Sequence, residues 1–158
     1  MPLSIRRAVA DDHSGLAALF ADAILTTGPS GYSPQQVTAW ASADFESIRS
    51  GLLSGHTLVA EDESGIVGFS DLAAEGYVSA LFVRGDRQRQ GVGSALLAEI
   101  IAEARRQGVA RLQTRASVFS RGTFAKFGFR LIDVQIVERR GATFQQEIME
   151  LMLNRDPS

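Results

Sequence analysis

A glycine-rich turn between a β-type segment and a helical segment carries the clearest chemical signal in this chain. The segment Tyr77–Val83 is β-rich, and after a polar loop residues Gln88–Gly93 read QRQGVG. Apolar residues then recur at three- and four-residue spacing, as in an amphipathic helix. The first amides of a helix attract anions, and glycine lets a ligand approach the backbone closely. The pattern predicts a phosphate-binding turn, and an ordinary turn that opens a surface helix fits the local sequence equally well.

Two further features bear on this turn. Arg87 and Arg89 would add attraction for phosphate groups. A Rossmann dinucleotide site is a poor alternative, because its glycine motif should follow an early strand and Ala95-Leu96 stands where its third glycine is expected.

The spacing Gln88-x-x-Gly91-x-Gly93 resembles motif A of the GNAT superfamily of N-acetyltransferases. Segments 5–20, 57–72 and 111–132 are similar to other parts of that family, in matching order and spacing. Segments 32–40 and 137–151 are similar to the YafP-like branch. The resemblance implies an α+β GNAT acyl-CoA N-acyltransferase fold. Its central sheet would be mixed, mostly antiparallel and of about six or seven strands, with helices on both faces.

The family's activity implies transfer of an acetyl group from acetyl-CoA to a primary amine of a small molecule or peptide. The amine would attack directly in a ternary complex, without a covalent enzyme intermediate. By resemblance, Tyr77–Val83 offers its backbone to the pantetheine arm and diverges from Arg111–Ala116, while amides of Gln88–Ser94 hold the pyrophosphate. The cofactor-binding residues implied are Leu81, Phe82, Val83, Gln88, Arg89, Gln90, Gly91, Val92, Gly93, Ser94, Ser117 and Phe124. The family commonly has glycine at position 89 and proline at position 85, where this chain has Arg89 and Gly85.

At the position expected to protonate the thiolate leaving group, this chain differs from the family pattern. The family's tyrosine position is occupied by Phe124, which cannot donate a proton. Phe124 is then either a core residue or a contact of the pantetheine. Ser117 stands where the family often has asparagine, and its hydroxyl, like that of Ser120, is expected close to the site. A thiol is a fair leaving group, so turnover need not depend on an acid.

The group that accepts the proton of the amine is equally open. The family's glutamate position is Tyr77, and the acidic position of YafP-like relatives is Ser79. Glu75 and Asp71 flank these positions and could act directly or through water, although each also fits a solvated turn carboxylate. The candidate catalytic residues are therefore Glu75, Tyr77, Ser79 and Ser117.

The acceptor side is expected around residues 27–40, where a Gly- and Ser-rich loop precedes aromatic residues. Tyr32 and Trp40 are the candidate substrate-binding residues, and Trp40 also fits a core position at helical spacing from Val37. Arg139-Arg140 is most simply a polar hairpin tip. A second class of function is an acyl-CoA-binding or sensing module with little transfer activity, which the residues at 77, 79 and 124 favour.

Composition sets further bounds. The chain has 158 residues, a net charge of −2 and no cysteine, so we expect a single acetyltransferase domain over residues 1–158. The charge argues against nucleic acid as a partner. Without cysteine there are no disulfides, thiolate ligands or cysteine nucleophile, and His13 and His56 give no metal signature. No signal core or long apolar run is present, so we expect a cytoplasmic protein with no membrane partner, for which a homodimer stays open.

Local patterns predict the remaining elements. Asp11 or Asp12 is expected to cap a first helix, Thr26–Ser33 to be a loop, and Pro34 to open a short helix to Ala41. Asp44 would cap a further helix carrying Phe45, Ile48 and Leu52. Helices are expected at 91–107 and 120–127, and strands at 3–8, 57–62, 66–72, 77–83, 111–116, 131–138 and 144–153.

Overall fold

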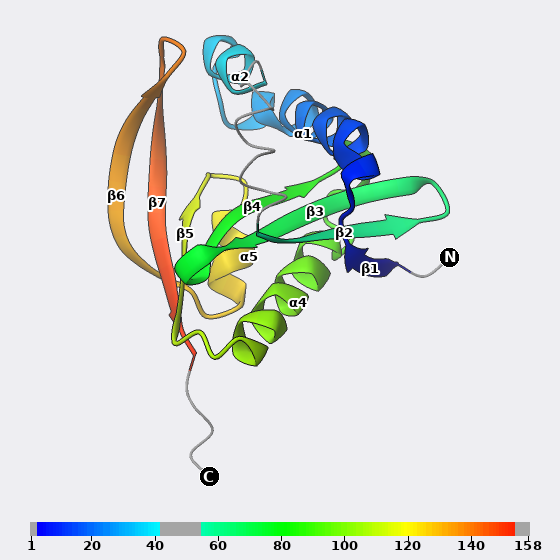
Figure 1. The fold of residues 1–158 in the computed structure, drawn as a ribbon. Coiled ribbons are helices and arrows are strands. Elements are labelled where there is room, and N and C mark those ends of the chain that lie inside the picture. The colour runs from blue at the N-terminus through cyan, green and yellow to red at the C-terminus, as the bar shows by residue number, and fades with distance from the viewer. Residues whose placement is uncertain (1–2, 42–54, 154–158) are drawn as a thin grey trace.

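The structure is a computed structural model that describes residues 3–41 and 55–153 (Figure 1). The helix expected after Asp44 lies outside these residues. Within them, seven strands form one sheet in the order β1-β2-β3-β4-β5-β7-β6. The strands are β1 (Ser4–Arg7), β2 (His56–Asp62), β3 (Gly65–Ala73), β4 (Tyr77–Val83), β5 (Arg111–Ala116), β6 (Arg130–Arg139) and β7 (Ala142–Met152).

The sheet is mixed because one neighbouring pair of strands is parallel. β4 and β5 run parallel, whereas the other pairings are antiparallel. Their register contains two pairs only, Tyr77 with Gln113 and Val78 with Thr114. Beyond Val78 the two strands diverge, and the V-shaped opening between them is visible in Figure 1. The expected separation of these strands is thus confirmed, and it begins at Ser79.

Helices cover both faces of the sheet, as expected. α1 (His13–Thr27) and α2 (Pro34–Ala41) lie on one side, and α4 (Val92–Arg106) and α5 (Arg121–Lys126) lie on the other (Figure 1). Side-chain alternation along β2 explains how one sheet serves both layers. Leu58 and Ala60 belong to the core under α4, while Val59 between them packs in the core under α1.

The N-terminal boundary differs from the sequence expectation. A 3₁₀ turn over Ala10–Asp12 precedes α1, and the Asp12 side chain does not cap the helix. Its carboxylate instead accepts hydrogen bonds from the Val9 amide at 2.7 Å and from Arg6 on β1 at 2.9 and 3.0 Å. The Asp12 carboxylate binds Arg6, six residues earlier in the chain, instead of the helix amides, because this charged partner supplies two charge-assisted hydrogen bonds.

Connections near the site also differ in length. α1 continues to Thr27, two residues into the expected loop, and a 3₁₀ turn over Gly28–Ser30 follows. β6 and β7 extend their hairpin beyond the expected ends, leaving Arg140 and Gly141 as the turn with φ of 52° and 81°. Two consecutive positive φ values are typical of the tight turn that matches the twist of a hairpin.

Candidate active site

The glycine turn opens α4 with a set of unpaired amides. Gly91 is the N-cap residue, with φ of 84°, and a side chain there would meet open space. The first bond of the helix runs from the Ala95 amide to the Gly91 carbonyl at 2.9 Å, so the amides of residues 92–94 precede it. No side chain of the described residues caps them. At the start of a helix such amides lack a partner within the helix, so the amides of residues 92–94 are available as donors for an anion.

The loop before this turn is held by its own side chains. Gln88 donates to the Val83 carbonyl at 2.7 Å. Arg87 lies 3.2 Å from an oxygen of Asp62 and 3.3 Å from one of Asp86, so its charge is largely neutralised. The expectation that Arg87 attracts phosphates is therefore not supported, since a neutralised guanidinium adds little long-range field. Arg89 is exposed, forms no ion pair with a described carboxylate, and has a φ of 61°.

The unusual residues at positions 85 and 89 have local explanations. A Cβ at Gly85 would collide with the side chain of Thr26 on α1, so there is no room for proline. The Gly85 amide also donates to Asp22 at 2.8 Å, a bond that proline could not make. Arg89 adopts the left-handed conformation that a glycine would adopt without strain.

A narrow cavity of about 90 Å³ leads from the glycine turn into the opening between the strands. Residues of β4 form one wall and residues after β5 form the other, and the cavity reaches Gln88 and Gly93. The residues on the walls include Leu81, Phe82, Val83, Ser117, Phe119, Ser120 and Thr123.

One cation near this cavity was not anticipated from the sequence. Lys126 at the end of α5 places its Nζ 3.4 Å from the Ser94 hydroxyl, in the first turn of α4. An ammonium beside a helix N-terminus adds positive charge where the amides already favour an anion. Lys126 and Ser94 are 32 residues apart in the sequence, so no local pattern predicts that they meet.

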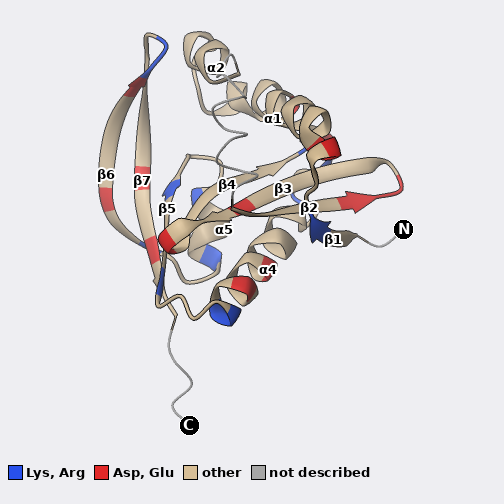
Figure 2. Ribbon diagram, in the orientation of Figure 1, with Lys and Arg blue, Asp and Glu red and all other residues tan. Residues whose placement is uncertain are grey.

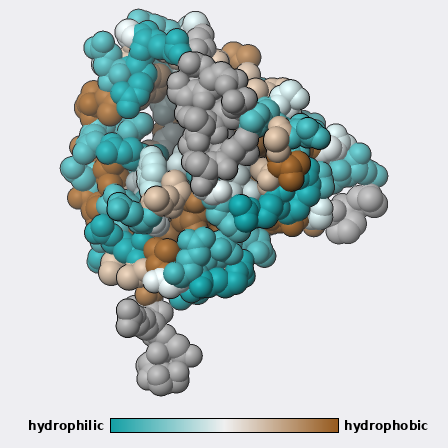
Figure 3. Space-filling view, viewed as in Figure 1, coloured by the Kyte–Doolittle hydropathy of each residue, from teal (hydrophilic) through white to brown (hydrophobic). Residues whose placement is uncertain are grey.

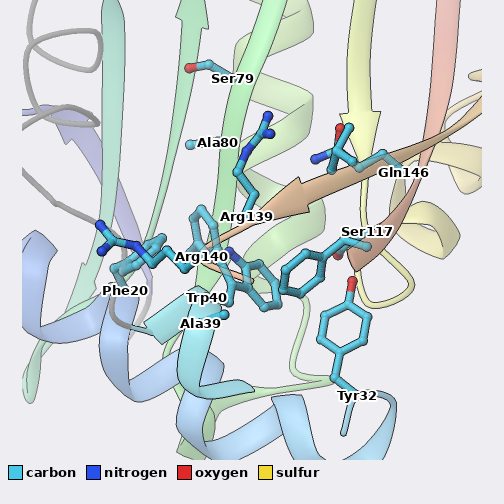
Figure 4. A pocket seen from close by; sticks show the side chains of 13 residues that line it. Phe20, Tyr32, Ala39, Trp40, Ser79, Ala80, Ser117, Arg139, Arg140 and Gln146 are labelled. Carbon is cyan, nitrogen blue, oxygen red and sulfur yellow. The ribbon is translucent and has the colours of Figure 1, made fainter. Parts of the chain in front are cut away.

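A second cavity of about 430 Å³ lies on the α1 and α2 side of the sheet (Figure 4). It shares Trp40, Phe82 and Ser117 with the narrow cavity, so the two spaces meet at these residues. Tyr32 contributes to its wall and contacts the rings of Trp40, Phe119 and Phe144 with centroids 5.5, 5.1 and 5.4 Å away. The expected positions Tyr32 and Trp40 are thus together at one cavity.

The far side of this cavity comes from the β6–β7 hairpin. Gln35 and Gln36 of α2 donate to the carbonyls of Gly141 and Thr143 at 3.1 and 2.7 Å, which fixes the hairpin against α2. Arg139, Arg140 and Gln146 consequently line the cavity. Local sequence patterns do not predict these roles, because the hairpin and α2 are more than 100 residues apart.

Tyr32 is neutral in this setting. Burial raises the pKa of the Tyr32 phenol, and a hydrogen bond with the backbone of Val118 opposes that shift. Figure 4 shows the Tyr32 hydroxyl directed toward Ser117, at the point where the cavities meet.

A buried carboxylate stands behind the cavity wall. Asp71 on β3 is 0% exposed, and its two oxygens accept hydrogen bonds from Thr57 at 2.7 Å and Ser79 at 2.6 Å. Burial raises the pKa of Asp71, while the hydrogen bonds from Ser79 and Thr57 oppose the rise. Ser79 lines the cavity, so its hydroxyl connects Asp71 to the space where a ligand would lie.

The other candidate catalytic residues are placed differently. Glu75 is exposed in the 3₁₀ turn before β4, with φ of 62°, and Tyr77 is 37% exposed. Neither lines either cavity, because both precede the point where β4 leaves β5. Ser117 lines both cavities, and its hydroxyl accepts from the amides of Phe119 and Ser120 at 3.2 Å.

Phe124 belongs to the core rather than to a cavity wall. It is 2% exposed and packs edge-to-face on Phe129, with ring centroids 5.0 Å apart. Its neighbours Ser120 and Thr123 line the narrow cavity, whereas Phe124 does not. The expected contact of Phe124 with the cofactor is thus not supported, because α5 turns this side chain inward.

Comparisons with known proteins agree with this arrangement. A family model described as an acetyltransferase (GNAT) domain matches residues 30–151. The chain is 34% identical over 142 residues to the uncharacterized N-acetyltransferase YafP of Escherichia coli K12, covering 90% of this chain and 91% of that protein. The chain belongs to the GNAT acetyltransferase family. Within that family it lies in the YafP-like branch.

Solved structures show the same fold. A GCN5-related N-acetyltransferase from Rhodopseudomonas palustris matches with a TM-score of 0.91 and 27% identity, over 97% of each chain. The PaiA N-acetyltransferase of Thermoplasma acidophilum, in complex with coenzyme A, matches with a TM-score of 0.79 and 19% identity, over 97% of this chain and 100% of that one. The expected GNAT fold is confirmed.

The described residues contain neither a membrane-spanning helix nor a metal-binding cluster. None of their helices combines the length and apolar character that crossing a membrane requires. Nor do residues 3–41 and 55–153 contain a group of three or more His, Cys, Asp or Glu side chains placed to hold a metal ion.

Proposed function

We propose that this protein transfers the acetyl group of acetyl-CoA to a primary amine of a small molecule, by direct attack in a ternary complex. One observation carries the proposal: two cavities meet at Trp40, Phe82 and Ser117. One leads to the uncapped amides of α4, and the other is lined by Ser79, whose buried partner Asp71 lies behind the wall. A thioester bound through the first would present its acetyl group to an amine bound in the second.

The cofactor side fits coenzyme A in three ways. The amides of Gln88–Ser94 and the ammonium of Lys126 would bind the pyrophosphate. Gly91 leaves space for its approach, since a Cβ there has no neighbour within 4 Å. The backbone of Leu81 and Phe82, which lacks a β5 partner, would hydrogen-bond to the pantetheine amides.

Proton removal is assigned to Ser79 and Asp71. When an ammonium binds against Ser79, the Ser79 oxygen accepts its proton while the Ser79 O–H passes its own proton to Asp71. The raised pKa of Asp71 suits this task, because a more basic carboxylate holds the proton better. Asp71 does not touch the amine. It orients the Ser79 hydroxyl and takes up the proton that this hydroxyl gives away, so it is a positioning residue. Glu75 stays a weaker candidate, since it is exposed outside both cavities.

Bond changes at the acetyl group need no further protein base. The neutral amine forms the C–N bond to the carbonyl carbon, the C–S bond breaks to release the thiolate, and the proton that the amide nitrogen then loses passes to this thiolate or to water. A thiol has an ordinary pKa of about 8.5, so its anion can leave without a tyrosine acid at position 124. The nearby hydroxyls of Ser117 and Tyr32 can hydrogen-bond to it.

The test is an amine panel assayed for acetyl-CoA-dependent thiol release, with mass spectrometry of the product. Transfer to at least one amine by wild type, and its loss in Ser79→Ala with retained CoA binding, is the expected result. Tight CoA binding without transfer to any amine would favour the sensing module instead.

We also propose that the protein forms a homodimer through β6. This ten-residue strand has a free edge and carries exposed apolar side chains, including Val134 at 43% and Ile136 at 68%. Figure 3 shows hydrophobic surface along that side of the molecule. A free apolar edge favours strand pairing.

The apolar residues of β6 support pairing with a second copy. An antiparallel pair centred on Val134 would bring the exposed Val134 and Ile136 of both copies into one apolar strip. The regular part of this pairing ends at the β-bulge between Leu131 and Asp133, where the register of β6 shifts.

A further inference from the structure

We propose that the acceptor is an amino-acid-like amine, which carries a carboxylate and an apolar, ring-sized body besides its amino group. Arg139 and Arg140 would bind the carboxylate, Gln146 and Ser79 would contact the amine, and the aromatic wall would enclose the apolar part. This inference rests on the acetyltransferase activity proposed above, and it goes further by naming the class of substrate.

The charge of the cavity is the first reason. Among the described residues that line it, Arg139 and Arg140 carry charge, and no aspartate or glutamate is present. Both arginines belong to the basic tip of the β6–β7 hairpin beside α2 (Figure 2). A polyamine or other purely cationic amine would be repelled, whereas a zwitterion brings the anion that these guanidinium groups lack.

The hydrogen bonds of the arginines leave donors for a ligand. Arg139 Nη1 donates to the Glu138 carbonyl at 2.9 Å, and neither Arg139 nor Arg140 forms an ion pair with a described carboxylate. A guanidinium offers five N–H donors and matches a carboxylate with two parallel bonds. A ligand carboxylate is therefore the complement that this hairpin tip is built to receive.

A buried acceptor atom is the second, independent reason. Gln146 Oε1 is buried and has no hydrogen-bond partner, and Gln146 lines the cavity from β7 (Figure 4). Such an atom is costly unless a donor fills the space in front of it. The N–H groups of a bound ammonium or amine provide that donor, and Ser79 on β4 provides an acceptor on the sheet side of the same cavity.

The apolar wall of the cavity indicates what the rest of the acceptor molecule is like. Phe20, Tyr32, Trp40, Phe82 and Phe144 line a volume of about 430 Å³. Binding sites of this size hold small molecules and bury most of their surface. A ring-sized or branched apolar side chain fills this wall, while a bare short-chain amine would leave it hydrated.

The central comparison is between L-phenylalanine and 2-phenylethylamine, which differ in the carboxylate alone, and a polyamine and a phosphate-bearing amine test the alternatives. Binding of L-phenylalanine, 2-phenylethylamine, spermidine and phosphoethanolamine is measured by calorimetry on CoA-saturated protein, and acetyl transfer to each is measured separately. We expect wild type to prefer phenylalanine over 2-phenylethylamine by about tenfold or more in Kd and in kcat/KM, which is the effect of one good charged contact. Arg139→Gln and Arg140→Gln should reduce this ratio toward one, without changing the KM for acetyl-CoA.

Arg106→Gln is the matched control, because it removes the same charge from the far end of α4, where Arg106 pairs with Glu103 at 2.9 Å. Its ratio should equal that of wild type. A ratio near one in wild type, or a preference for spermidine or phosphoethanolamine, would overturn the inference while leaving acetyl transfer intact. Carboxylate-dependent binding with no transfer to any amine would support the inference and instead contradict the proposed function.

Discussion

The hydroxyl of Ser79 lies 2.6 Å from Asp71 Oδ2, which joins a carboxylate with no exposed surface to a cavity that a ligand can enter. A register shift between β3 and β4 at Asp71 and Leu72 accompanies this contact. Such an irregularity re-aims side chains at a sheet position. The pair is the structural basis for the proton relay.

Asp71→Asn should lower kcat/KM by about 10²-fold, since general-base contributions have that size. Wild-type activity needs ionised Asp71, so it should fall as pH falls through the raised pKa of this carboxyl, and the variant should lose that limb. A pH profile of kcat/KM checks both. Identical profiles for the two proteins would remove Asp71 from the mechanism.

The same substitution should not destabilise the fold at neutral pH. A raised pKa means that the folded state prefers protonated Asp71, so its stability contribution is present below the ordinary value of 3.8 and is lost as pH rises through the folded pKa. Neutral asparagine removes that loss, so the variant's stability relative to wild type should increase with pH. Thermal unfolding between pH 4 and 8 measures it, and a constant difference would contradict the assigned pKa direction.

Phe124→Tyr should reduce stability without raising kcat. The added hydroxyl would enter a core position that is 2% exposed, and an unpaired buried hydroxyl costs about 1–3 kcal/mol. Denaturant unfolding and steady-state kinetics are the measurements. An increase in kcat would show that position 124 reaches the thiolate, contrary to its placement in the core.

Arg89→Gly should separate stability from cofactor affinity. Glycine relieves a φ of 61°, which costs a non-glycine residue about 1–2 kcal/mol, but it also removes an exposed cation beside the turn. We expect unchanged or higher thermal stability together with weaker CoA binding, most clearly at low salt. Equal CoA affinity at low salt would mean that Arg89 does not contact the phosphates.

Ile136→Lys should convert a dimer to a monomer, because it places a charge in the middle of the proposed β6 interface. Ala98→Lys, at an exposed position of α4, is the control that should stay dimeric. Sedimentation at several concentrations distinguishes them. Wild-type protein that stays monomeric at high concentration would refute the dimer.

The parts of the fold that short-range patterns control were predictable. The apolar spacing of α4 and the hairpin tip at Arg139-Arg140 follow from local chemistry, and the structure has the helix at Val92–Arg106 and the turn at Arg140 and Gly141. Asp12 was predicted wrongly as a cap because its stronger partner, Arg6, lies on a strand whose contacts the local pattern cannot show.

The acceptor side of the site was harder to predict from the sequence. The composition of their segment predicts Tyr32 and Trp40, but Gln146 and Arg139 reach the acceptor cavity, and Lys126 the cofactor side, through tertiary packing alone. Counting back from the glycine turn predicts Tyr77, and the position just before the strand predicts Glu75, but neither shows where β4 parts from β5. The position of that separation, after Val78, decides which residues of β4 line the cavity.

The most direct test of the central claim is calorimetric titration of CoA into wild type, Gly91→Glu and Gly108→Glu. Gly91 and Gly108 have φ of 84° and 75°, both open to space, and they lie before and after α4, so the two variants carry the same added charge and a similar backbone cost. The account predicts that Gly91→Glu weakens CoA binding by at least about 10²-fold, because a carboxylate would face the pyrophosphate, while Gly108→Glu binds like wild type. Equal affinity in all three proteins would contradict the assignment of the glycine turn to the cofactor.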